Sequence, residues 1–391
     1  MAGGRALLAS VTALAIATLG CAPEPAPSPS DGPGPSRTAS TAPTSAATTP
    51  VRIKPTSIEL HLLDAMYVPS FAPVSTGDEI LWAGGTPSPS EIWRYVPGSP
   101  EPQRIYASSR RGSTITAVAG SRGGYAFVES SKPEFGDGGW RIWYLPDAAA
   151  QPIELDRGNA KHAGTWPTVA VDERRVAWDA FDEPVGSTVE EAFEKARSRL
   201  SIAATGDPAA TITLLDLSVR ERVIWFPELN GDELWYSIIE PPNALSGRAD
   251  HYHIETIDLA QPGAVATPFA GFGNDFDPSV DDAYVVWKSN PIGDGAMNWG
   301  PLELLDRAAG TVTTIPFERA GRPSLGDRFV TFGELFSAKL PLYDLETGTV
   351  IDLAGQMPEA IADATFYGEN VRGRLLTFGV GARIGWAILP E

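Results

Sequence analysis

The chain has 391 residues, 43% hydrophobic and 20% charged, a composition that suits a globular fold with a substantial core. A formal net charge of −19 argues against binding to nucleic acid or to an anionic membrane surface, because no basic patch could neutralise phosphates. The single cysteine excludes an internal disulfide.

Residues 1–20 resemble a bacterial lipoprotein signal peptide. Arg5 precedes the apolar run Ala6–Ala17, which is too short to span a bilayer comfortably, and Cys21 follows directly. Thr18 departs from the aliphatic residue usual at its position. We expect Cys21 to be lipidated and the protein to sit on the extracytoplasmic side of the cell membrane, held only by this lipid. An ordinary secretory signal with an incidental cysteine is the alternative.

Residues 21–56 are predicted to form a disordered tether. Ala22–Pro50 consists largely of Pro, Ser, Thr and Ala, and such a segment cannot bury enough apolar surface to fold. As a semi-rigid spacer of about 29 residues it could reach up to ~90 Å, at ~3.1 Å per residue. Residues 57–391 are predicted to be one folded domain.

That domain repeats one sequence pattern. In Asp277–Trp287 (DPSVDDAYVVW) a proline opens a short strand, an acidic turn follows, and a second strand ends on an aromatic residue. Six further copies, the last two without the proline, are Phe71–Trp82, Thr165–Trp178, Phe226–Tyr236, Arg322–Phe332, Thr116–Phe127 and Asp363–Phe378. Irregular periods of roughly 40–60 residues are typical of propellers or arrays.

The units continue into a third and a fourth strand. In the second unit these are Arg141–Leu145 and Pro152–Leu155, and in the sixth they are Leu340–Leu345 and Val350–Leu353. Four antiparallel strands are the content of one propeller blade. The sequence therefore predicts an all-β fold, a seven-bladed β-propeller, with six blades as the alternative.

The two ends of the domain complement each other. The chain ends at Arg383–Glu391, which parallels the third strand of the second unit, so the last unit lacks a fourth strand. The alternating segment Ser57–Asp64 is a half-buried strand that belongs to no unit. We expect Ile58–Leu62 to complete the last blade, which would remove exposed sheet edges.

The segments DPSVDDAYVVW and RPSLGDRFVTF resemble the repeats of TolB-like propellers. Those repeats carry a proline, a short turn with Ser or Asp, and an aliphatic-aromatic strand. The resemblance covers the repeats of residues 58–391 and no catalytic motif. It implies an extracytoplasmic interaction domain, although the usual six blades of that family differ from the seven counted here.

A helix is predicted in the third blade, between its second and third strands. Ser187–Leu200 begins with a capping box formed by Ser187 and Glu190, and Glu191 and Lys195 have the spacing of a helical charge pair. The expected apolar face consists of Val189, Phe193, Ala196 and Leu200.

The candidate ligand site is predicted on the face that carries the loops between second and third strands. These loops are long in blades two to five, at Glu129–Trp140, Ala180–Arg199, Ile238–Asp250 and Ser289–Gly300. Loops on a rigid frame often carry function, so we expect a protein, peptide or glycan to bind there. Neutral insertions are the alternative.

The residues before the blade prolines should ring the axis on this face: Ala72, Trp166, Phe226, Asp277 and Arg322. Trp166, Asp277 and Arg322, together with Glu129 and Trp299 of the long loops, are the predicted ligand-binding residues. Asp277 and Arg322 could pair at the channel mouth, and Trp166 could stack on a sugar. An inter-blade salt bridge and an aromatic plug are the structural alternatives.

Catalytic patterns are mostly missing from the sequence. It contains neither a G-x-S-x-G elbow nor an H-E-x-x-H pair. Carboxylates that could serve a glycosidase are Glu129, Asp179, Asp277 and Glu334, a number expected by chance in so acidic a chain. We therefore predict a non-catalytic binding or interaction module, with a carbohydrate-active hydrolase or lyase as the alternative.

Two histidines are the candidate metal ligands of the sequence. His251 and His253 would share a face of a strand, with Asp250 as a third ligand. A structural or surface role for these histidines is favoured, and we predict neither a metal nor a cofactor.

Overall fold

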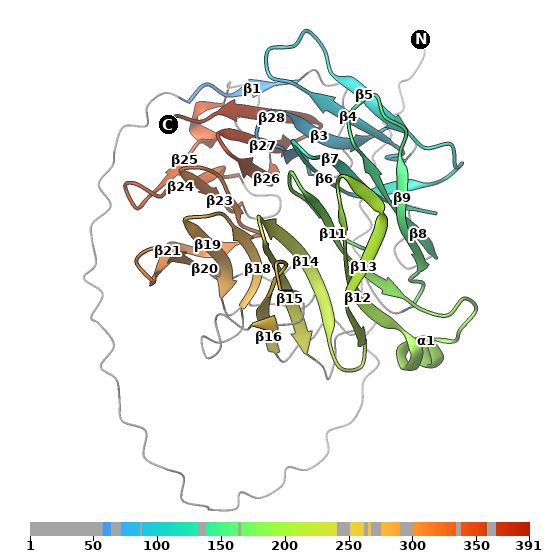
Figure 1. Cartoon of the computed structure of the whole chain (residues 1–391). Helices are drawn as coiled ribbons and strands as arrows, with labels where there is room; N and C mark the ends of the chain where they lie inside the picture. Colours follow the sequence, from blue (N-terminus) through green and yellow to red (C-terminus); the bar gives the residue numbers. More distant parts are fainter. Residues whose placement is uncertain are drawn as a thin grey trace, which may run out of the picture. The chain divides into compact units, whose positions relative to one another are not determined.

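The computed structural model describes residues 58–63, 72–86, 88–131, 138–162, 166–240, 251–261, 265–266, 275–289, 300–333, 338–357 and 365–391. The strands within these ranges form seven four-stranded antiparallel sheets, which are the blades of a β-propeller (Figure 1). The predicted fold class and the predicted number of blades are confirmed, and the six-blade alternative is wrong.

Each blade is a meander that begins at the inner strand. Blade one comprises β2 (Val74–Ser75), β3 (Ile80–Gly84), β4 (Glu91–Tyr95) and β5 (Gln103–Ala107). Blade two comprises β6 (Thr114–Ser121), β7 (Gly124–Ser130), β8 (Gly139–Leu145) and β9 (Ile153–Asn159). Blade three comprises β10 (Val169–Val171), β11 (Arg175–Asp182), β12 (Arg197–Ala204) and β13 (Asp207–Ser218).

The remaining blades follow the same order. Blade four comprises β14 (Val223–Asn230), β15 (Glu233–Glu240), β16 (His251–Asp258) and β17 (Val265–Ala266). Blade five comprises β18 (Asp275–Val280), β19 (Tyr284–Ser289), β20 (Gly300–Asp306) and β21 (Thr311–Ala320). Blade six comprises β22 (Ser324–Leu325), β23 (Phe329–Thr331), β24 (Pro341–Asp344) and β25 (Thr349–Asp352). Blade seven comprises β26 (Phe366–Arg372), β27 (Leu375–Val380), β28 (Arg383–Ile388) and β1 (His61–Leu62).

Blade seven confirms the predicted closure of the ring. β1 pairs with β28 in the register His61↔Trp386 and Leu62↔Gly385, and the two strands lie side by side in Figure 1. The His61 ring stacks on the Trp386 indole with centroids 4.1 Å apart. Leu63 is buried beyond the strand, and its N–H donates to the Ile384 carbonyl at 2.9 Å. The first described strand thus covers the edge of the last one.

The second strands are buried because every blade is covered by a neighbour on each side. Each contains, or in blade six is directly followed by, an aromatic residue that is at most 1% exposed: Trp82, Phe127, Trp178, Tyr236, Trp287, Phe332 and Phe378. These strands are nearly continuous hydrophobic runs, as expected for strands buried on both faces. The repeated aromatic residue of the sequence pattern is therefore a packing residue between blades.

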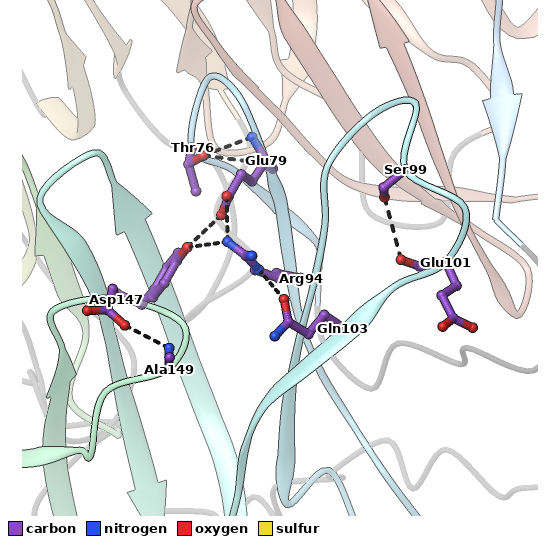
Figure 2. Close-up of polar contacts among 9 residues, drawn as sticks. Thr76, Glu79, Arg94, Ser99, Glu101, Gln103, Asp147 and Ala149 are labelled. Carbon is purple, nitrogen blue, oxygen red and sulfur yellow. Dashed lines mark hydrogen bonds and ion pairs between the residues drawn. The ribbon is translucent and has the colours of Figure 1, made fainter.

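Polar contacts also join neighbouring blades. Glu79 of blade one accepts a hydrogen bond from the Tyr125 hydroxyl of blade two at 2.7 Å and another from Arg94 Nη1 of its own blade at 2.8 Å. Arg94 Nε in turn donates to Gln103 at 3.0 Å, as Figure 2 shows. Burial of Tyr125, with its hydrogen bond to the Glu79 carboxylate, raises the pKa of its hydroxyl to about 12.

The helix of blade three lies between the second and third strands, as predicted, but the predicted bounds are wrong. α1 spans Val189–Lys195, and its capping box is formed by Thr188 and Glu191. The pair Glu191–Lys195 is present at 3.6 Å. The expected apolar face is not formed, because Val189 is exposed, Ala192 is the buried residue, and Leu200 belongs to β12. No helix in the described part of the chain is long and apolar enough to span a bilayer.

Candidate functional site

The inner strands of the seven blades surround an axial cavity of about 630 Å³. Its wall includes residues of every blade, from Val74 in blade one to Arg372 in blade seven. Ala72 and Arg322, which precede the inner strands of blades one and six, line this cavity and are exposed, so it opens to solvent at this end. We call this opening the mouth. The volume lies within the range of about 300–1,000 Å³ usual for small-molecule sites.

Arg372 narrows the opposite end of the cavity. It extends from blade seven, and its Nη1 donates to the Gly120 carbonyl of blade two at 3.2 Å and to the Val171 carbonyl of blade three at 3.3 Å. Beyond it lies a smaller hollow, which Arg372 also lines together with Arg122 and Asp172. The guanidinium therefore separates the cavity from the far face.

Two residues at the mouth have strained backbones. Phe226 and Asp277 have φ angles of 53° and 54°, in the left-handed region that residues other than glycine seldom adopt. Each occupies a bulge, and each N–H is held by the second strand of the preceding blade. Phe226 N donates to Asp179 Oδ2 at 3.0 Å, and Asp277 N donates to Ser237 Oγ at 3.0 Å. Such strain costs about 1–3 kcal/mol per residue, and it clusters at functional sites.

Asp277 forms an ion pair within its own blade. Its Oδ2 lies 2.5 Å from Lys288 Nζ, and the side chains of both residues are 5% exposed. The expected pair with Arg322 is not formed, because the β18–β19 register places Lys288 opposite Phe276, next to Asp277. Asp277 Oδ1 is buried and has no hydrogen-bond partner among the described residues.

Arg322 reaches past blade five to blade four. Its guanidinium lies over the Phe226 ring, 4.5 Å from the centroid. It is also close enough to Asp179 and Glu228 for its charge to oppose the rise in their pKa values. The cavity is thus bounded by one arginine at its mouth and another at its far end.

Buried carboxyl groups surround the cavity. Burial raises the pKa of Asp179 to about 7, although Thr168 donates to that carboxylate from its N–H at 2.6 Å and its hydroxyl at 2.8 Å. Asp179 stands behind the wall and positions Phe226. Burial also raises the pKa of Glu228, against the opposing charges of Arg372 and Arg322. Glu228 lines the cavity, which leaves part of its surface accessible.

Glu369 takes the place of the blade proline in blade seven. It lines the cavity, is 8% exposed, and its Oε1 has no hydrogen-bond partner in the described structure. Gly333 of blade six makes room for it, because a Cβ there would collide with the carboxylate. Burial raises the pKa of Glu369 to about 7.

This pKa predicts a pH dependence of stability. Between the ordinary glutamate pKa of 4.5 and about 7 the folded protein binds the Glu369 proton more tightly than the unfolded chain does, so stability falls as pH rises. Glu369→Gln removes this loss. Relative to wild type, its free energy of unfolding should rise by on the order of 2–3 kcal/mol from about pH 5 to about pH 8 in urea titrations. Glu101 is exposed, so the control variant Glu101→Gln should show the same pH dependence of the free energy of unfolding as wild type. Equal pH dependence in Glu369→Gln would contradict the assignment.

Asp277 and Arg322 line one cavity, together with Ala72 and Phe226, and their role in ligand binding stays a prediction. Trp166 is half-buried and is not one of the lining residues. Trp299 and Glu334 lie outside the described residues, as do most positions of the long loops in blades two, four and five.

Glu129 is fully buried on β7 and does not line the cavity. Its carboxylate accepts hydrogen bonds from Ser108 Oγ and, at 3.1 Å, from Trp143 Nε1, and Arg110 lies 4.0 Å away. A ligand contact for Glu129 stays a prediction.

The histidine pair of the metal alternative lies on β16. His253 contacts Glu255 at 3.0 Å and Glu240 at 3.9 Å, whereas Asp250 is not described. The described residues contain no group of three or more His, Cys, Asp or Glu that could hold a metal ion.

Among the charged residues that line the cavity, sequence reasoning missed Asp281 and Asp327 and also Lys288, Glu228, Glu369 and Arg372, of which the last four matter for the site. Two of them left a signal. Lys288 is the one charged residue of the strand YVVWKS, and Glu369 replaces the proline of the repeat. Glu228 and Arg372 follow ordinary positions of the pattern, and only the closed ring places them in one cavity.

Comparison with known proteins shows the fold alone. The chain matches no protein-family model and no curated protein. It is similar to the β-propeller domain of the Trilobed protease from Pyrococcus furiosus (TM-score 0.52, 12% identity, 83% of this chain and 94% of that one). It is also similar to oligogalacturonate lyase from Vibrio parahaemolyticus (TM-score 0.54, 9% identity, 86% and 95%). A puromycin-hydrolyzing peptidase from Mycobacterium tuberculosis has a TM-score of 0.53 at 15% identity, with 81% of this chain covering 50% of that one. The chain thus spans about half the length of that peptidase.

Proposed function

We propose that the protein is an extracytoplasmic, lipid-anchored β-propeller that acts as a non-catalytic binding module, with its ligand at the mouth of the axial cavity. One observation carries the proposal: an exposed arginine, Arg322, lies over the strained Phe226 at the mouth of a cavity of about 630 Å³. Backbone strain is kept only where the surrounding structure enforces it, and such sites are often ligand clamps.

A binding role is further supported by the state of the ionic groups near the mouth. Asp277 is paired with Lys288, and the Asp179 carboxylate accepts hydrogen bonds from Thr168 and Phe226. Groups held in this way shape a site and cannot freely exchange protons with a substrate. The resemblance of the repeats to TolB-like propellers also favours an interaction role.

The proposed anchor rests on the signal-like residues 1–20, on Cys21, and on the Pro-rich tether of residues 21–56. We expect Cys21→Ser to abolish incorporation of a labelled fatty acid and to release the protein from the membrane fraction. Because this lipid is the only proposed attachment to the membrane, its loss should be visible in simple fractionation. Unchanged labelling of the variant would contradict lipidation at Cys21.

The binding proposal is tested by affinity capture of the full-length protein from gently solubilised membranes. Arg322→Ala should reduce the recovery of the specific partner by about tenfold or more, since a lost charge-assisted contact is worth about 1.5–3 kcal/mol. Arg104→Ala is the matched control, because Arg104 lies on the outer strand β5 and pairs with Glu91 at 2.6 Å. Equal loss in both variants, or in neither, would count against the mouth as the binding site.

A carbohydrate-active hydrolase or lyase is the second candidate, and one observation favours it. Glu228 and Glu369 line the same cavity, and burial raises the pKa of both carboxyls, which suits a general acid. Turnover of an oligosaccharide that is lost in Glu228→Gln would support it. A broad glycan panel without turnover would remove this candidate.

A further inference from the structure

The axial cavity presents charges of both signs. Its wall carries the carboxyl groups of Glu228, Asp277 and Glu369 and the cationic groups of Lys288 and Arg322, and Arg372 lies at the far end. Asp281 and Asp327 also line the cavity. A ligand in this cavity therefore meets both acidic and basic groups, and the contacts that these groups already make show which of them can take a ligand.

Two carboxylate oxygens of residues that line the cavity are buried without a hydrogen-bond partner in the described structure. Lys288 binds one oxygen of Asp277, but the other, Oδ1, has no partner among the described residues, and Asp277 is 3% exposed. Glu369 Oε1 is also buried without a hydrogen-bond partner among the described residues. Native proteins leave few buried polar atoms without a partner, because each one costs about 1–3 kcal/mol. A ligand that donates hydrogen bonds would satisfy these oxygens.

Hydrogen-bond donors are available at the mouth. Arg322 is exposed, and its guanidinium lies over the Phe226 ring rather than against a carboxylate. A guanidinium held over a ring keeps N–H donors at its edges, in the fork that matches a carboxylate. Arg372 is less available, because its Nη1 already donates to two backbone carbonyls.

The arrangement of charged groups in the cavity determines which charges a ligand can carry. A simple anion on Arg322 would also meet the carboxylates of Glu228 and Asp277, and a simple cation would also meet Arg322 and Lys288. A ligand with an ammonium and a carboxylate at its two ends can place each charge against its complement. About 630 Å³ is ample for an amino acid or a short peptide.

We propose that the cavity binds a small zwitterion, a free amino acid or a short peptide, with its carboxylate on Arg322 and its ammonium on Asp277 Oδ1 and Glu228. This inference rests on the proposed function and names the ligand class for the same site. Because the protein contacts both charged ends of the ligand, removing the charge at either end should weaken binding.

Calorimetric titration of the full-length protein in detergent tests this with four probes: trialanine, N-acetyl-trialanine, trialanine amide and alanine. Trialanine should bind about tenfold or more tightly than either blocked form, because each blocked form loses a charge-assisted contact. Comparison with alanine separates a peptide from a free amino acid. Cellobiose serves as the uncharged ligand.

Two variants test which residues bind the carboxylate end of the ligand and which bind its ammonium end. Arg322→Gln should bring the affinity ratio of trialanine to its amide close to one, and Glu228→Gln should lower the ratio of trialanine to its acetylated form. A second variant of the residues proposed to bind the ligand's ammonium is Asp277→Asn combined with Lys288→Met. It removes both charges of the buried pair and should therefore preserve the fold. Arg104→Ala, remote from the cavity, should keep both ratios.

The outcomes separate this inference from the proposed function. Equal binding of the three peptides, or binding of none by the folded protein, overturns the zwitterion proposal. If cellobiose binds while the peptides do not, the inference fails and the binding module stands. Hydrolysis of trialanine would contradict a non-catalytic module, whereas a preference for two free ends would still support the ligand class.

Discussion

Replacing Lys288 with methionine is expected to lower the free energy of unfolding by about 3–5 kcal/mol. The Lys288 ammonium and the Asp277 carboxylate are 2.5 Å apart, and the side chains of both are 5% exposed. Methionine keeps most of the aliphatic stem, so the change removes mainly the charge. The carboxylate would then be buried without a counter-ion, on a residue whose backbone φ of 54° is already strained.

The double variant Lys288→Met with Asp277→Asn is the matched control. It removes both charges, and replacing a whole buried pair is often nearly neutral, so most of the lost stability should return. Denaturant unfolding of wild type, the single variant and the double variant measures the coupling. A single variant that loses less than about 1 kcal/mol would show that the pair does not support the mouth.

Removing residues 1–63 should destabilise the fold about as much as Lys288→Met. The deletion takes away β1, the hydrogen bond from Leu63 to Ile384, and the buried side chains of Ile58 and Leu63. Losing two buried aliphatic side chains costs at least about 4 kcal/mol, and we expect the melting temperature to fall by about 6 °C or more. The uncovered edge of β28 should also promote aggregation.

A chain lacking only residues 1–56 is the control for this deletion. It keeps β1 and loses the segment predicted to be signal and tether, so its melting temperature should equal that of the full-length protein. Light scattering during heating would report aggregation of the shorter variant. Equal melting of the two truncated chains would mean that strand exchange between the ends contributes little to the closed ring.

The blades could be predicted from sequence because each one is specified locally. A proline, a turn and a buried aromatic recur within about a dozen residues, and burial on both faces keeps the second strand hydrophobic. The closure by β1 was also predictable, since a unit without its fourth strand and a strand without a unit stand at opposite ends of the domain. Counting strands was therefore enough to predict seven blades.

The helix shows where local pattern is overridden. Ala196 and Leu200 have helical spacing from Val189, yet Arg197–Ala204 pairs with β11 over eight successive positions. As β12, these residues pair with β11 on one side and with β13 on the other, and a helix continued to Leu200 would break the pairing at that end of the blade. Helix α1 therefore ends at Lys195, and its capping box begins one residue later than the sequence suggested.

The site was only half predictable, because its partners are brought together by the closed ring. Position before the proline placed Asp277 and Arg322 at the mouth. It did not reveal that Lys288 would take the Asp277 carboxylate, or that Arg322 would reach Phe226 in blade four. Those contacts depend on side-chain reach across blades, for which one sequence carries no signal.

Site-specific photocrosslinking tests the location of ligand binding most directly. A photoreactive amino acid replaces Ala72, which is exposed and lines the cavity, or Ile212, which is 60% exposed on the outer strand β13. We predict a specific adduct from the Ala72 position in the membrane-bound protein, lost when Arg322→Ala is added, and none from Ile212. Adducts from Ile212 alone, or adducts from Ala72 that persist in Arg322→Ala, would contradict binding at the mouth.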